Sequence, residues 1–129
     1  MSSELDRFRS GFERRVSRQL EKAGASFEYE SLKVKYQWPP RDATYHPDFI
    51  IQTRSGKLLL IESKGLFVAK DRQKHLLVKA QRPDLDIRFL FMRSATKISK
   101  TSSTTYAAWC EKHGFKYADL VIPQEWLDE

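Results

Sequence analysis

The sequence predicts a single α/β (α+β) domain, residues 1–129, in which helices flank a mixed β-sheet. Three observations indicate this class. Apolar residues recur at helical spacing near the N-terminus, three strand-like stretches follow in succession, and a fourth comes only after a second helix. Because a strand reached through a helix runs parallel to an earlier strand, we expect both strand directions in the sheet and the element order αβββαβα.

The first helix is indicated by apolar side chains spaced by three or four residues, which places them on one helical face. The stripe consists of Leu5, Phe8, Phe12, Val16 and Leu20. Ser2 or Ser3 is the expected N-cap, and Gly24 is the expected end of the helix. Apolar residues then alternate over 27–29 and, one residue out of phase, over 32–38, so we expect a strand, then a bulge or a break, and then strand again.

A β-hairpin is expected next, with residues 45–53 and 58–63 as its arms and Arg54-Ser55-Gly56-Lys57 between them. Residues 71–81 read as a short helix. Its inward side chains are predicted to be Leu76, Leu77 and Ala80.

The C-terminal third is predicted to alternate strand, loop and helix. Residues 87–92 read as a buried strand, followed by a loop rich in Ser, Thr and Lys. Thr104 is the expected N-cap of a helix that ends at His113, before Gly114, and residues 123–126 form a last turn.

Positive charge is concentrated in the middle of the chain. The net charge is +6, but residues 54–100 alone hold 12 basic and 4 acidic side chains, a net of +8. Residues 1–53 carry +1 and residues 101–129 carry −3. A solvated face is the simpler reading of such an excess, whereas its local concentration favours a polyanion such as nucleic acid.

Several classes of protein are excluded. The single cysteine, Cys110, cannot form a disulfide framework or a Cys-rich zinc site, and it fits a reducing, cytoplasmic setting as a core residue of the third helix. No apolar run approaches the ~20 residues that span a bilayer, so we expect no membrane partner.

The register of the hairpin decides whether two carboxylates meet. With a two-residue loop, Asp48 and Glu62 point to opposite faces. A three-residue loop, Arg54-Ser55-Gly56, places Asp48 directly opposite Glu62 and Lys64 opposite His46, and its last position suits a glycine. We expect this second register.

Two carboxylates about 5 Å apart repel each other, and their burial is costly unless a cation lies between them. Oxygen ligands favour Mg²⁺, with Mn²⁺ as a substitute, and Lys64 could orient an attacking water beside the metal. Asp48, Glu62 and Lys64 therefore indicate metal-assisted phosphodiester hydrolysis. Charged residues at a solvated strand end are the alternative for so short a pattern.

At these residues the sequence resembles the PD…(D/E)xK nuclease superfamily, whose restriction-endonuclease-like core has the same element order. Longer strings resemble the phage endonuclease I family, which resolves four-way DNA junctions. These strings include Phe8-Arg9-Ser10-Gly11-Phe12-Glu13, Phe27-Glu28-Tyr29-Glu30, Pro47-Asp48-Phe49, Glu62-Ser63-Lys64-Gly65, Asp71-Arg72-Gln73-Lys74-His75-Leu76-Leu77 and Cys110-Glu111-Lys112-His113-Gly114. The chain departs from the family in a longer hairpin between Asp48 and Glu62, which keeps the parity of their pairing.

The resemblance implies a magnesium-dependent endodeoxyribonuclease acting on branched DNA in the cytoplasm of a phage host. Asp48, Glu62 and the backbone carbonyl of Ser63 would bind the metal, Glu13 would complete the site directly or through water, and Lys64 would orient the nucleophile. It also implies an intertwined, domain-swapped homodimer in which residues 1–38 are exchanged. Without the resemblance, Glu13 reads as a surface residue.

Basic side chains near the site are expected to contact DNA phosphates. They are Arg72, Lys74, His75, Lys79, Arg93, Lys97, Lys100 and His46. His75 is expected on the surface of its helix, and an ordinary strand-end histidine is the alternative for His46. Two other functions stay open: a restriction-, repair- or transposition-type nuclease with the same catalytic residues, and a non-catalytic basic DNA-binding module.

Overall fold

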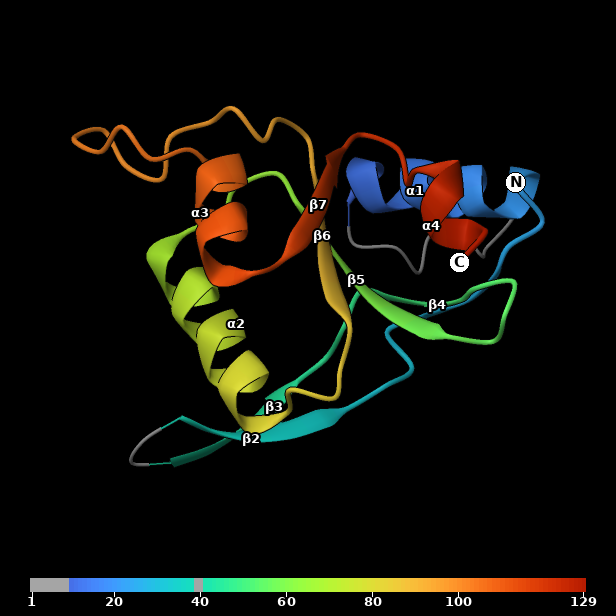
Figure 1. Cartoon of the computed structure of the whole chain (residues 1–129), viewed down its shortest axis with the longest axis horizontal. Coiled ribbons are helices and arrows are strands. Elements are labelled where there is room, and N and C mark those ends of the chain that lie inside the picture. Colours follow the sequence, from blue (N-terminus) through green and yellow to red (C-terminus); the bar gives the residue numbers. More distant parts are fainter. Residues whose placement is uncertain (1–9, 39–40) are drawn as a thin grey trace.

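The computed structural model describes residues 10–38 and 41–129, and it shows two sheets with helices on either side (Figure 1). The strands are β1 (Ser26–Tyr29), β2 (Val34–Trp38), β3 (Arg41–Tyr45), β4 (Phe49–Gln52), β5 (Leu58–Lys64), β6 (Ile87–Phe91) and β7 (Lys116–Asp119). The helices are α1 (Gly11–Lys22), α2 (Ala69–Gln81), α3 (Tyr106–His113) and α4 (Gln124–Leu127). No helix in these described stretches combines the length and the apolar character needed to cross a bilayer.

The main sheet is mixed, as the sequence predicts. Its strand order is β1-β4-β5-β6-β7. β4 pairs antiparallel with both β1 and β5, whereas β5 pairs parallel with β6, and β6 pairs parallel with β7. β7 was not expected from the sequence. It adds an edge strand after α3. Five strands instead of three precede α2, and α4 follows β7, so the described order is longer than αβββαβα.

The predicted first arm of the hairpin, residues 45–53, is too long. Its first residue belongs to a strand of the smaller sheet, and only Phe49–Gln52 form a strand of the main sheet. Tyr45 ends β3, which pairs with β2 in a separate two-stranded sheet, and its partner there is Val34. Pro47 follows, and proline has no amide hydrogen for a ladder, so β4 begins only at Phe49. Between residues 29 and 34 the structure shows the break and not the bulge, because β1 and β2 belong to different sheets.

The register predicted for the hairpin is confirmed. Phe49 pairs with Ile61, and Gln52 pairs with Leu58. The same register, extended by one residue, places Asp48 opposite Glu62. The amide of Thr53 donates to the carbonyl of Lys57 over 2.8 Å and closes a three-residue loop. Gly56 occupies the last loop position with φ 90°, a conformation that residues with a Cβ rarely adopt.

Each face of the main sheet is covered by its own apolar cluster. α1 and α4 cover one face, where the cluster contains Val16, Leu20, Ile61 and Trp126. α2 and α3 cover the other face together with the β2–β3 hairpin (Figure 1). Because side chains of a strand alternate in direction, Leu60 joins the second cluster while its neighbours Leu59 and Ile61 join the first.

The start of α1 differs from the expected start. The backbone of Ser10 is extended, and its hydroxyl accepts a hydrogen bond from the amide of Glu13 over 3.0 Å, so the helix begins at Gly11. The proposed cap residues and the first members of the stripe lie outside the described residues: Ser2, Ser3, Leu5 and Phe8. Gly24 follows the helix with φ 68°, as expected for a helix end.

Helices α2 and α3 correct two expectations. The predicted inward residues Leu76 and Leu77 do pack against the core, but Ala80 is exposed, and His75 and Val78 are the buried residues of α2. The N-cap of α3 is Thr105, whose hydroxyl accepts from the amide of Ala108, and not Thr104. The predicted closure by Gly114 is confirmed with φ 76°.

Candidate active site

Four carboxylates come together where β4 and β5 meet the N-terminal part of α1. Glu13, Asp48 and Glu62 are only 5%, 3% and 3% exposed. Carboxylate oxygens of Glu13, Glu30 and Asp48 lie within 4.8 Å of one another. The burial of Glu13 contradicts its reading as a surface residue and agrees with the role that the family resemblance implies.

Asp48 is held by the residue that follows Glu62. The amide and the hydroxyl of Ser63 donate to its Oδ2 over 3.0 and 3.1 Å. Burial, followed by the charges of Glu62 and Glu13, raises the pKa of Asp48 to about 8, although the hydrogen bond from the Ser63 amide and the charge of Lys64 act in the opposite direction. The site therefore disfavours the ionised carboxylate unless a positive charge joins it.

Glu62 is held from two sides. The hydroxyl of Tyr45 donates to its Oε2 over 2.7 Å, and the ammonium of Lys64 lies 3.7 Å from its Oε1. Burial raises the pKa of Glu62, while Lys64 and the Tyr45 hydrogen bond oppose that rise. Lys64 is also 3.5 Å from Oδ2 of Asp71 in the first turn of α2, so this helix helps to place the predicted catalytic lysine.

Glu30 is a candidate ligand that sequence reasoning missed. It has φ 51°, and its amide donates to the carbonyl of Asp48 over 3.0 Å. The pairing of Tyr29 with Phe49 in the antiparallel β1–β4 ladder places the next residue, Glu30, beside Asp48. Tyr29 belongs to the same corner, because its hydroxyl donates to Oε1 of Glu13 over 3.0 Å.

These donors fit a hard divalent cation. Carboxylate oxygens are the ligands that Mg²⁺ and Mn²⁺ prefer, and several of them are buried here at short mutual distances. Burial and then the charges of Glu62 and Glu13 raise the pKa of Asp48, so a nearby cation would stabilise its ionised form. Glu13, Glu30 and Asp48 are therefore suited to hold such an ion, and the buried Glu62 lies opposite Asp48 at the end of β5.

A cavity of about 510 Å³ opens beside the carboxylates. Its lining comes from the start of α1 and from the ends of β5 and β6: Ser10, Gly11, Phe12, Arg15, Ser63, Gly65 and Met92. Ser63 connects the cavity to the site, since the same residue donates to Asp48. The cavity offers room for part of a polymeric substrate next to the candidate metal ligands.

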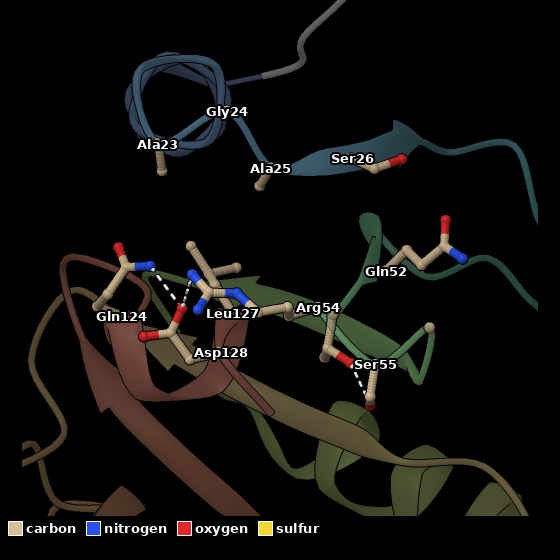
Figure 2. Close-up of a pocket in the computed structure, with 12 residues that line it drawn as sticks. Ala23, Gly24, Ala25, Ser26, Gln52, Arg54, Ser55, Gln124, Leu127 and Asp128 are labelled. Atoms are coloured by element: carbon tan, nitrogen blue, oxygen red, sulfur yellow. Dashed lines mark hydrogen bonds and ion pairs between the residues drawn. The ribbon is translucent and has the colours of Figure 1, made fainter.

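Another cavity, of about 520 Å³, lies away from the carboxylates (Figure 2). It is bounded by the end of α1, the β4–β5 loop and α4. The charged side chains in it neutralise each other, because Arg54 lies 3.0 Å from Asp128, which also accepts from Gln124. We assign no chemistry to this cavity.

Apart from Lys64 and Lys70, the basic side chains of residues 54–100 fall into two groups, and His46 is considered with the second. One group is ion-paired away from the site: Arg54, Lys57, Arg82 and Arg88. The other group contains the predicted DNA contacts, of which Lys79, Arg93, Lys97, Lys100 and His46 are exposed and Arg72 and Lys74 are half-buried. Arg72 donates to the carbonyl of Phe67, and Lys79 donates to that of Gly114.

The surface position predicted for His75 is wrong. Its ring is fully buried and packs against the rings of Tyr45, Phe67 and Phe89. Burial, together with the nearby charges of Lys74 and Lys64, lowers its pKa well below the ordinary value, so the ring is neutral. His75 therefore does not belong with the exposed basic groups.

Known proteins resemble this chain over nearly its whole length. The sequence pattern of the family described as phage endonuclease I matches residues 1–129. Endonuclease I of Escherichia phage T7 is 50% identical over 122 residues, which cover 95% of this chain and 79% of that protein. Endodeoxyribonuclease 1 of Enterobacteria phage T3 is 47% identical over 116 residues, 90% of this chain and 74% of that protein. The chain belongs to the phage endonuclease I family.

Proposed function

We propose that this protein is a metal-dependent, structure-selective endodeoxyribonuclease that resolves four-way junctions in branched DNA. Its family and the names of its relatives indicate an endonuclease. The observation that carries the finer proposal is the convergence of Asp48, Glu62 and Lys64 at the end of β5, with Glu13 buried beside them.

Asp48 and Glu62 would bind Mg²⁺, with Mn²⁺ as a substitute. The Ser63 carbonyl and Glu13 would complete the set, and Glu30 is close enough to contribute. A divalent cation in such a site polarises a phosphodiester and makes a bound water a better nucleophile. Its charge would also offset the burial of Asp48 and its repulsion by Glu62 and Glu13, which together raise the pKa of Asp48.

The protein's own groups then orient the reaction. Lys64 lies between Glu62 and Asp71, where its ammonium can hold an attacking water and offset negative charge on the phosphate. The low exposure of Asp48 and Glu62 excludes bulk water from their oxygens, which strengthens the electrostatic interactions there.

Resolution of a junction requires two cuts on symmetric strands, and therefore two sites at a fixed separation. A homodimer provides them. In the structure of one chain, Glu13 lies beside Asp48 of the same chain. We propose that residues 1–38 exchange between subunits in the dimer, so that Glu13 of one chain occupies this place in the other.

Phosphate contacts from the exposed and half-buried basic side chains would position DNA without reading its sequence. Lys97 and Lys100 lie in the loop between β6 and α3, and Lys74 lies on α2. We place this activity in the cytoplasm of the phage host, where replicating DNA provides branched substrates.

The test is cleavage of a labelled four-way junction and of a linear duplex with the same sequence, in Mg²⁺, Mn²⁺ or Ca²⁺, followed on denaturing gels. We expect paired, symmetric cuts in the junction with Mg²⁺ or Mn²⁺. Glu62→Gln should bind the junction without cutting it, whereas Glu125→Gln, at an exposed position of α4, should cut normally.

The same experiment separates the other functions. Equal cleavage of the linear duplex would favour a restriction-, repair- or transposition-type nuclease. Junction binding without cleavage in any of the three metals would favour a DNA-binding module. Normal cleavage by Glu62→Gln would reject the assigned site.

A further inference from the structure

We infer that Tyr45 is a positioning residue for Glu62, fixing this carboxylate for a divalent cation from a strand outside the main sheet. The inference rests on the proposed function, because it concerns the same metal site. Tyr45 ends β3, and β3 pairs only with β2 in the part of the chain that the structure describes. The residue nevertheless reaches the carboxylate at the end of β5.

The hydrogen bond between the side chains of Tyr45 and Glu62 is short and buried from solvent. The Tyr45 hydroxyl donates to Glu62 Oε2 over 2.7 Å, Tyr45 is fully buried, and Glu62 is 3% exposed. Water cannot easily replace a donor in such a place. Loss of the hydroxyl would leave a buried carboxylate oxygen without its partner and free the side chain to rotate.

The ring of Tyr45 is itself held in place by α2. His75 packs edge-on against it, with centroids 5.1 Å apart and planes at 86°, and the ammonium of Lys74 lies 5.6 Å from the ring centroid. Both ring nitrogens of His75 lack a hydrogen-bond partner among the described residues, so this histidine acts through the shape of its ring. These contacts restrict the orientation of the Tyr45 ring and direct its hydroxyl toward Glu62.

This arrangement leaves Glu62 able to accept a further ligand. The tyrosine occupies one position on Oε2, and Oε1 faces Lys64 at 3.7 Å. A carboxylate that a hydrogen bond to one oxygen already holds in place loses less conformational entropy on binding a cation than a mobile carboxylate does. Groups that orient metal ligands in this way typically contribute about 10- to 100-fold to metal affinity.

The decisive variant is Tyr45→Phe, which removes the hydroxyl and keeps the ring. Its matched control is Tyr117→Phe, because the Tyr117 hydroxyl also donates to a glutamate, Glu111, over 2.8 Å but on an exposed surface. Mn²⁺ and Ca²⁺ binding would be measured by calorimetry without DNA, alongside urea unfolding in EDTA. We expect about 10- to 100-fold weaker metal binding for Tyr45→Phe and unchanged binding for Tyr117→Phe.

A positioning role also predicts a pattern that a merely structural role does not. Cleavage by Tyr45→Phe should need more Mg²⁺ for half-maximal rate and recover part of its rate at high Mg²⁺. In a Glu62→Gln background, Tyr45→Phe should cause no further loss of metal affinity, because its effect passes through Glu62. This cycle keeps the inference testable even where Tyr45→Phe lowers stability.

If the wild-type protein binds metal and cuts DNA but Tyr45→Phe leaves metal affinity unchanged, this inference is overturned and the proposed function is not. An equal loss in the Glu62→Gln background would also overturn it, since Tyr45 would then act by another route. A wild-type protein that binds no divalent cation would overturn the proposed function itself.

Discussion

Replacement of Asp48 by asparagine should flatten the dependence of stability on pH in the metal-free protein. The pKa of this carboxyl rises from 3.8 to about 8 in the folded protein, because it is buried near Glu62 and Glu13. The folded state therefore holds a proton that the unfolded state has already released. Stability that is fully present below the unfolded pKa is lost as the pH rises through the folded pKa.

The size of the effect follows from this difference in pKa. Between about pH 6.5 and about pH 8.5 the unfolded carboxyl stays ionised, while the folded one changes from mostly protonated to mostly ionised. One proton per molecule is worth about 1.4 kcal/mol per pH unit, so wild type should lose about 2 kcal/mol over this interval. Asparagine has no proton to lose, and its amide oxygen can still accept from Ser63.

Urea unfolding in EDTA at the two pH values measures the effect. The control is Asp84→Asn, an exposed position paired with Arg82, whose pH dependence should match wild type. His75 titrates in the unfolded state near the lower pH, but it is common to all three proteins and cancels in the comparison. Addition of Ca²⁺ at high pH should stabilise wild type and not Asp48→Asn.

Equal pH slopes in wild type and Asp48→Asn would refute this reasoning, because the carboxyl would then ionise as readily in the folded state as in the unfolded chain. Stabilisation of Asp48→Asn by Ca²⁺ to the wild-type extent would place the cation elsewhere.

Three further predictions concern the core, the subunits and DNA. Arg88→Met should lower the free energy of urea unfolding by about 3 kcal/mol, because the buried guanidinium holds Asp86 and Glu129 over 2.6–2.9 Å; a loss below about 1 kcal/mol would contradict this. Co-expression of Glu13→Ala and Asp48→Ala chains should restore nicking of one strand if sites are shared between subunits; no activity would indicate unshared sites. Lys97→Ala should reduce the slope of log affinity against log salt by about one per subunit, measured by fluorescence anisotropy; an unchanged slope would make Lys97 a solvated charge.

The central part of the site was predictable because it depends on local structure. The distance along the chain from Asp48 to Glu62 and a glycine at the last loop position were enough to choose the register, and the register then placed the two carboxylates opposite each other. Lys64 followed from its place two residues further along the same strand. Such features require only a hairpin and its turn.

The remaining features depend on contacts between distant segments. Glu30 reaches Asp48 only because β1 joins the edge of the sheet, a pairing that periodicity does not reveal. His75 is buried because Tyr45, Phe67 and Phe89 surround it from three other segments, although a histidine next to two leucines gives no sequence signal of burial. Tyr45 was assigned to the wrong sheet for the same reason.

The hydrogen bonds between α1 and the segment before α4 affect when α1 can dock during translation. The side-chain amide of Gln19 exchanges two hydrogen bonds with the backbone of Ile122, over 2.9 and 2.8 Å, and α1 packs on Trp126 and Leu127. Helix α1 therefore lacks its full docking surface until residues 122–127 have left the ribosome. Because Glu13 is carried by that helix, a nascent chain that already holds Asp48 and Glu62 would lack a firmly docked Glu13, and the proposed carboxylate site would stay incomplete until residues 122–127 emerge.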